Sequence, residues 1–62
     1  MVRYKFMVPP TMEVGSFSGI CDSYNDTTYQ QDALWQYNSA REHDGLPPLK
    51  RMPKGTKYIK IN

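Results

Sequence analysis

Cys21 and His43 have the side chains best suited to catalysis or metal binding, and they are the only cysteine and the only histidine of the 62-residue chain. A thiol nucleophile with a histidine base also needs a third group that orients the imidazole, and no motif supplies one. One cysteine and one histidine are too few ligands for a structural zinc site. We therefore expect no enzyme activity, no metal and no other cofactor. Cys21 is expected to be a small buried apolar side chain, and His43 to lie at a helix C-terminus, where the dipole favours it.

The charged residues divide the chain into an acidic middle and a basic end. Residues 11–48 contain every acidic residue of the chain and the single cation Arg41, whereas residues 49–62 contain cations and no acid, in a chain with a formal net charge of +2. This asymmetry has two explanations. It indicates a surface for a charged partner, or two solvated faces that attract each other.

The N-terminal third predicts two strands of an antiparallel hairpin. Residues 2–8 (VRYKFMV) alternate with period two, which indicates a strand with its even-numbered residues on one side and its odd-numbered residues on the other. Prolines at 9–10 end it, because they have no N–H for a ladder. Residues 11–20 predict a second, weaker strand with a bulge near Gly15. Residues 21–28 are rich in turn formers and predict a polar loop.

The polar loop leads into a helix that is expected to end near Glu42, because Gly45 and two prolines follow. Several residues could provide the N-cap, and two pairs have the spacing of a capping box. The candidate N-caps are Asp26, Thr27 and Thr28, and the capping-box pairs are Thr27 with Gln30 and Thr28 with Gln31.

Residues 56–61 (TKYIKI) predict a third strand after a turn at Gly55, with Ile59 and Ile61 toward the core. The order is then strand, strand, helix, strand. The simplest way to bury these apolar stripes is one α+β domain over residues 1–62, in which a single helix packs on one face of a three-stranded, largely antiparallel sheet.

Trp35, the only tryptophan, lies on the polar side of the expected helix. At about 100° per residue, Ala33 and Tyr37 mark the apolar face, and Trp35 lies roughly 160° from its centre. Two alternatives follow. The indole is exposed, or the proline-rich residues 46–49 fold back and cover it.

The basic end makes nucleic-acid binding one class of function. Its cations surround Tyr58 and could follow a phosphate backbone while the ring stacks on a base. The pattern of a helix, LPPLK, a turn and GTKYIKI resembles the helix and wing of excisionase-type winged-helix proteins, which implies DNA binding. Asp32 and Glu42 on the helix argue against this class, because they would repel phosphate.

Protein binding is the second and favoured class, because an exposed tryptophan is typical of binding hot spots. The helix segment ALWQY and the closing PKGTKYIKI resemble small phage inhibitors of bacterial RNA polymerase of the T7 type. The resemblance implies a phage-encoded host-takeover protein that binds and inhibits or modulates a larger host protein. The expected partner-binding residues are Trp35, Asp32, Glu42, Lys50, Arg51, Lys54, Lys57 and Tyr58.

The length of the chain makes its stability marginal, because so short a chain buries only about 60% of its unfolded surface. It must rely on packing, on a partner or on self-association as a homodimer. We expect no signal peptide and no membrane span, because no apolar run has the length of a signal peptide or approaches the roughly 20 residues that cross a membrane. The expected location is the cytoplasm, which for a phage protein means that of the host cell.

Overall fold

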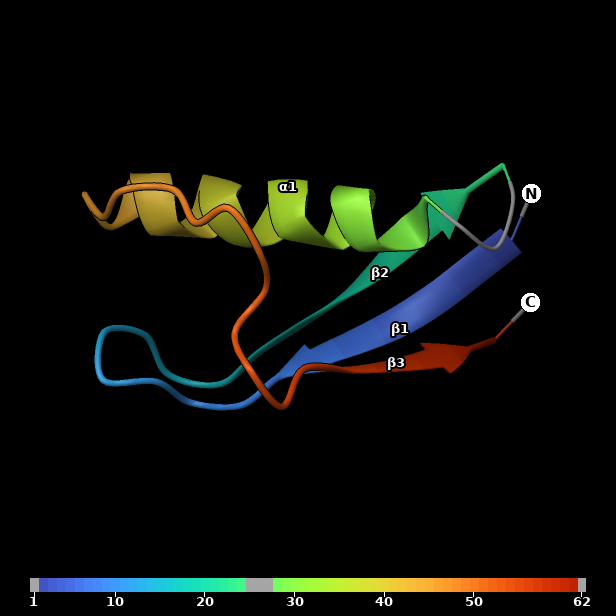
Figure 1. The fold of residues 1–62 in the computed structure, drawn as a ribbon, viewed down its shortest axis with the longest axis horizontal. Coiled ribbons are helices and arrows are strands. Elements are labelled where there is room, and N and C mark those ends of the chain that lie inside the picture. Colours follow the sequence, from blue (N-terminus) through green and yellow to red (C-terminus); the bar gives the residue numbers. More distant parts are fainter. Residues whose placement is uncertain (1, 25–27, 62) are drawn as a thin grey trace.

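The computed structural model describes residues 2–24 and 28–61. The elements are β1 (Val2–Val8), β2 (Phe17–Ser23), α1 (Tyr29–His43) and β3 (Lys57–Lys60). The strands form one antiparallel sheet in the order β2-β1-β3, and α1 lies across one face of it (Figure 1). The expected α+β fold with its strand, strand, helix, strand order is therefore confirmed. In the described part of the chain, no helix has the length and apolar character needed to cross a membrane.

β1 is the central strand, and its alternation is as the sequence predicts. Phe6 and Val8 are buried on the helix side, and the register pairs Phe6 with Gly19 of β2. A Cβ added to Gly19 would lie 3.0 Å from the Phe6 ring, so glycine leaves the space that the ring occupies. The hairpin is thus built around a large ring facing a residue without a side chain.

The expected antiparallel hairpin is confirmed, but its second strand, β2, covers Phe17–Ser23 instead of residues 11–20, and the expected bulge near Gly15 is wrong. Thr11 ties the preceding residues into a turn: its N–H donates to the Val14 carbonyl oxygen at 2.8 Å, and its hydroxyl accepts the Val14 N–H at 3.1 Å. Side-chain hydrogen bonds of this kind compete with a strand ladder. The strand instead continues through Cys21 to Ser23, in a stretch whose composition indicated a loop.

The start of α1 differs from the expected capping box. The N-cap is Thr28, but its side chain forms no capping hydrogen bond. The Thr28 hydroxyl is instead hydrogen-bonded to the Ser23 hydroxyl, so it connects the helix start to the end of β2. The Thr28–Gln31 capping box is therefore wrong. The other candidate caps, Asp26 and Thr27, lie outside the described residues.

The end of α1 is a Schellman motif. The Leu46 N–H donates to the Arg41 carbonyl oxygen at 2.9 Å, and the Gly45 N–H donates to the Glu42 carbonyl oxygen at 2.9 Å. Gly45 has φ of 77°, the left-handed conformation that this motif requires. Gly45 therefore ends α1 at His43, one residue after the expected end at Glu42, and turns the chain back along the helix.

β3 has the opposite orientation to the one expected from its isoleucines. The register pairs Tyr58 with Phe6, which places Tyr58 on the helix side. Ile59 and Ile61 therefore face away from α1, and both are about half exposed. Because side chains alternate along a strand, a register different by one residue exchanges the two faces. The turn at Gly55 is confirmed, with φ of 93°.

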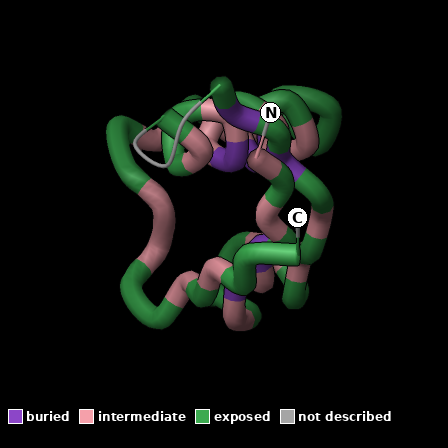
Figure 2. The backbone as a smooth tube through the Cα atoms, turned by 90° about the vertical axis from the view of Figure 1, so that its right-hand side faces the viewer, coloured by how far each residue is buried: buried purple, intermediate pink, exposed green. Residues whose placement is uncertain are grey.

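The core lies between α1 and the sheet (Figure 2 marks its buried positions in purple). Its centre is formed by Phe6, Val8, Cys21, Ala33 and Tyr37. Cys21 is fully buried, as expected for a small apolar side chain. Burial raises the pKa of its thiol, and the nearby Asp32 and Asp22 raise it further. The thiol is therefore protonated at neutral pH and shielded from reagents.

The hydroxyl of Tyr37 is the weak point of this core. The side chain is fully buried, and within residues 2–24 and 28–61 its hydroxyl has no hydrogen-bond partner. An unpaired buried hydroxyl costs about 1–3 kcal/mol. We expect Tyr37→Phe, which keeps the ring and its edge-on contact with Phe17, to raise the free energy of unfolding by about 1 kcal/mol in urea denaturation. Lower stability of the variant would show that the hydroxyl is paired in solution.

Candidate protein-binding groove

The residues that follow α1 run back along it and form one wall of a groove. We term residues 46–52 the strap (Figure 1, orange). Asn38 holds it at its middle: its side-chain amide donates to the Leu49 carbonyl oxygen at 3.0 Å and accepts the Leu49 N–H at 2.9 Å. Arg41 holds it nearer the helix end by donating from Nε to the Pro47 carbonyl oxygen at 2.8 Å. The strap thus has a defined position beside the helix.

Arg41 is a buried cation, which the sequence did not predict. Its side chain is 2% exposed, and Nη1 lies 3.0 Å from Oε1 of Glu13, whose side chain is 52% exposed. Glu13 belongs to the β1–β2 connection, so this ion pair joins that connection to both the helix and the strap. The available signal was spacing, because Ala33, Tyr37 and Arg41 follow each other at intervals of four residues on the buried face.

A hollow of about 420 Å³ lies between the C-terminal half of α1 and the strap. We term it the tryptophan hollow; its lining is Trp35, Asn38, Ser39, Glu42, Leu46 and Pro48. Trp35 is 69% exposed. The outward orientation is therefore confirmed, and the covering of the indole by residues 46–49 is wrong. The strap lies beside the indole because Asn38 and Arg41 hold it there.

A second hollow of about 240 Å³ lies along the N-terminal half of α1. We term it the basic hollow; its lining is Gln30, Gln31, Leu34, Lys50, Arg51, Met52 and Tyr58. Tyr58 packs edge-on against Tyr29 with ring centroids 5.2 Å apart. Burial raises the pKa of Tyr58, so its phenol is neutral at pH 7. This hollow therefore offers an apolar wall, amide groups and the exposed cations Lys50 and Arg51.

The two hollows lie one after the other along α1 and the strap and share no lining residue. We refer to the two hollows together as the groove, which has opposite charges at its two ends. Leu34 lines one and Trp35 lines the other. Glu42 supplies negative charge at one end, and Lys50 and Arg51 supply positive charge at the other. None of these three charged side chains forms an ion pair with any other described residue. Their charges are available to a partner.

Three of the expected binding residues lie outside this groove. Lys54 and Lys57 are exposed but line neither hollow. Asp32 points to the outer edge of β2, where its Oδ2 accepts the Asp22 N–H at 3.1 Å. One turn later, the Gln36 amide donates to the Ile20 carbonyl oxygen at 2.8 Å. Asp32 thus connects α1 to β2 and is not part of the groove. The expected binding residues that do line the groove are Trp35, Glu42, Lys50, Arg51 and Tyr58.

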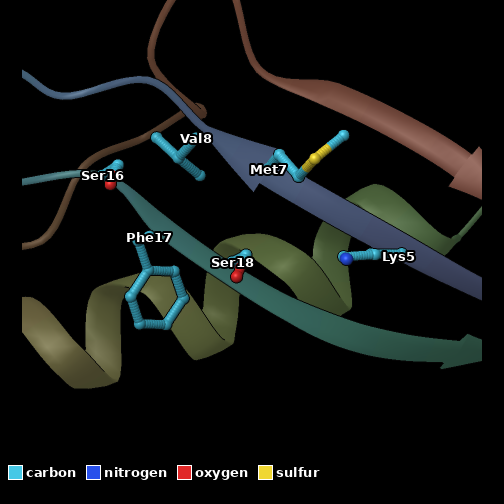
Figure 3. Close-up of a pocket in the computed structure, with 6 residues that line it drawn as sticks. All are labelled: Lys5, Met7, Val8, Ser16, Phe17 and Ser18. Carbon is cyan, nitrogen blue, oxygen red and sulfur yellow. The ribbon is translucent and has the colours of Figure 1, made fainter.

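The cysteine and the histidine lie in different parts of the described structure. Cys21 is buried inside the sheet and His43 is exposed in the last turn of α1, so the thiol and the imidazole do not share an accessible site. Across residues 2–24 and 28–61, no three histidine, cysteine or acidic side chains lie together as a metal site. A third hollow at the end of the β1–β2 ladder is shown in Figure 3; its lining is Lys5, Met7, Val8, Ser16, Phe17 and Ser18.

Comparisons with protein-family models, with curated proteins and with solved structures found no match to the chain. The geometry of the groove is therefore the basis for proposing a function. The resemblances to phage inhibitors and to excisionase-type proteins stay predictions.

Asn38 offers a test of how the groove is built. We expect Asn38→Ala to lower the free energy of unfolding by about 1–2 kcal/mol, because it removes two hydrogen bonds to the main chain of Leu49. The freed strap should also exchange its amide protons faster, which hydrogen exchange would measure at Leu49. Ser39→Ala is the matched control on the same helix. An unchanged exchange rate at Leu49 in Asn38→Ala would mean that other contacts hold the strap.

Proposed function

We propose that this chain is a non-catalytic protein-binding domain that docks on a larger protein through the groove between α1 and the strap. The observation that carries the proposal is Trp35, an indole 69% exposed on the wall of a hollow that also contains the apolar side chains of Leu46 and Pro48. Tryptophan gains more than most side chains when a partner buries it, and it is among the residues most enriched in hot spots. The hydrogen bonds of Asn38 and Arg41 support the wall beside it, so little ordering is required on binding.

The charges of the groove define the partner surface that would fit. An apolar side chain would enter beside Trp35. A cation of the partner would face Glu42, and an acid would face Lys50 and Arg51. Opposite charges at the two ends set the orientation of docking and disfavour the reversed orientation.

Inhibition of a larger host protein follows from this mode of action when the docked surface is one that the host protein needs. This proposed mode of action agrees with the resemblance to phage-encoded inhibitors of bacterial RNA polymerase, and the expected location is then the cytoplasm of the host cell. The groove supports docking; the identity of the host protein is a matter for the experiment below.

Nucleic-acid binding is the second candidate, and one observation favours it. Tyr58 lines the basic hollow together with Lys50 and Arg51, so a base and a phosphate could be bound at neighbouring positions. The discriminating measurement is binding to duplex and single-stranded DNA at about 50 and 200 mM salt. Micromolar binding that weakens steeply with salt would favour nucleic acid, and absence of binding at the lower concentration would remove this candidate.

The main experiment is affinity capture from bacterial lysate with three forms of the chain: wild type, Trp35→Ala and Tyr24→Ala. Tyr24 is the matched control, because it is also an exposed aromatic residue but lines neither hollow. A protein retained by wild type and by Tyr24→Ala, and lost with Trp35→Ala, would support the groove as the binding site. The groove would be contradicted if no captured protein is lost with Trp35→Ala while being retained by Tyr24→Ala.

A further inference from the structure

The sheet has a second face, and no helix of the described chain covers it. α1 packs on the side of Phe6 and Val8, so the intervening residues of each strand point the other way. They are Arg3, Lys5 and Met7 of β1, Ser18, Ile20 and Asp22 of β2, and Lys57 and Ile59 of β3, with Ile61 following on the same side. We term this set the open face. Its isoleucines are 44% (Ile20), 48% (Ile59) and 50% (Ile61) exposed.

The strand register places Lys5 between two of these isoleucines. Lys5 pairs with Ile20 on one side and with Ile59 on the other, and directly opposed side chains on a sheet are in contact distance. Ile61 is close by, because its N–H donates to the carbonyl oxygen of Arg3 at 2.9 Å. On the open face, aliphatic side chains therefore lie on both sides of Lys5.

The charge of this surface is positive and only partly balanced. Nε of Arg3 lies 2.8 Å from Oδ1 of Asp22, so these two residues neutralise each other. Lys5 and Lys57 remain, and neither forms an ion pair with another residue in the described ranges. A partner that buries the isoleucines must also provide carboxylates for these two ammonium groups, because burying them unpaired is costly.

We propose that the open face is a second docking site, which takes an amphipathic helix of a partner protein whose apolar stripe is flanked by carboxylates. Helices pack well on sheets of this kind, and the 15-residue α1 already covers the other face of the same three strands. A helix on the open face would cover Ile20, Ile59 and Ile61 with its stripe. Its acids would lie against Lys5 and Lys57.

Two other occupants fit this surface less well. A second copy of the chain, docked through the same face, would bring the two Lys5 ammonium groups together across the interface, and like charges opposed in this way are destabilising. A nucleic acid would bury the aliphatic isoleucines, which cannot stack on bases as aromatic side chains do. An acidic amphipathic helix satisfies both the apolar area and the charge.

The open face is independent of the groove proposed above. The two surfaces lie on opposite sides of the sheet, because the groove is formed by α1 and the strap. The chain could therefore bind two protein segments at once. Their charge requirements differ, since the groove has charges of both signs and the open face has unpaired cations alone. Failure of one site leaves the other proposal intact.

The test uses the full chain and two synthetic helical peptides that share one leucine stripe. One carries glutamates beside the stripe and the other carries lysines. NMR titration would follow the methyl groups of Ile20, Ile59 and Ile61. We expect the glutamate peptide to shift these methyl signals and to bind roughly tenfold more tightly than the lysine peptide. Lys5→Gln should weaken this preference, and Lys5→Glu should abolish it, because the new carboxylate offsets the charge of Lys57.

Three results would overturn the proposal. The first is equal binding of the two peptides by the wild-type chain. The second is binding that Trp35→Ala abolishes, because Trp35 belongs to the groove and not to the open face. The third is displacement of the glutamate peptide from the isoleucine methyl groups by a mixed-sequence DNA duplex, which would identify nucleic acid as the preferred occupant. Well-dispersed spectra of each variant would confirm that it is folded.

Discussion

Glu13→Gln should lower the free energy of unfolding by about 2 kcal/mol, a large effect for a side chain on the surface. The reason is its partner, because the Arg41 guanidinium is buried and Glu13 Oε1 is the carboxylate oxygen 3.0 Å from it. Removing one partner of a buried pair leaves an uncompensated charge, which costs about 3–5 kcal/mol. We expect less than this range, because Glu13 is half exposed and water can partly replace it. Urea denaturation would measure the change.

A double-mutant cycle tests whether this effect arises from the buried charge. Arg41→Met keeps an apolar chain of similar length and removes the charge. When methionine is present at 41, Glu13→Gln should cost little, so the coupling energy should be about 1–2 kcal/mol. Additive losses from the two substitutions would contradict the expected coupling.

Trp35→Ala should weaken binding to the partner by about 30-fold, equivalent to about 2 kcal/mol, because it truncates the one large aromatic side chain exposed in the groove. Stability should change by well under 1 kcal/mol, since an exposed indole contributes little to packing. Titration calorimetry with the captured partner and thermal denaturation of the free chain would measure the two quantities. A loss of stability near 3 kcal/mol would show that the indole is buried in solution.

The fluorescence of the free chain provides an independent check, because it contains a single tryptophan. We expect red-shifted emission that iodide quenches readily, as for an indole in water. In complex with the partner, the emission should shift to the blue and quenching should decrease. Quencher-resistant emission from the free monomer would contradict the exposed position of Trp35.

The sequence predicted those features that depend on local pattern. The alternation of residues 2–8 identified β1, and the apolar spacing of Ala33 and Tyr37 identified the inner face of α1. The same spacing placed Trp35 outside. Gly45 and Gly55 were expected at chain reversals, and both have positive φ. In each case the decisive interactions lie within a few residues of each other.

The features that the sequence did not predict depend on residues far apart in the chain. Tyr58 faces the core in place of Ile59 because the register of β3 against β1 pairs Tyr58 with Phe6. The pattern of two isoleucines in the sequence favours the opposite face. Arg41 is buried because Glu13 reaches it from 28 positions away. Thr11 forms hydrogen bonds that hold its segment in a turn instead of a strand, and the composition of the segment does not indicate these bonds.

Some residues of the candidate site could likewise be predicted from local pattern, and others could not. Trp35 and Glu42 could be identified from one helix. The other groove residues, Lys50, Arg51 and Tyr58, could not be identified in this way. Their position beside the helix depends on the course of the strap, which Asn38 fixes by its hydrogen bonds to the main chain of Leu49. No periodicity in the sequence indicates a side-chain amide pairing with the backbone of a segment eleven residues later. The open face was missed for a simpler reason, because Ile59 and Ile61, two of its three isoleucines, were assigned to the core.

The contacts of Asp32 and Gln36 with β2 have a consequence for aggregation. A helix advances about 6 Å in four residues, and a strand advances about 6.7 Å in two. Asp32 and Gln36 can therefore follow the outward-facing groups of Asp22 and Ile20 as the neighbouring strand of a sheet would. A strand from another molecule can add here only after breaking both hydrogen bonds. The helix thus protects β2 from the edge-to-edge pairing through which exposed sheets grow into fibrils.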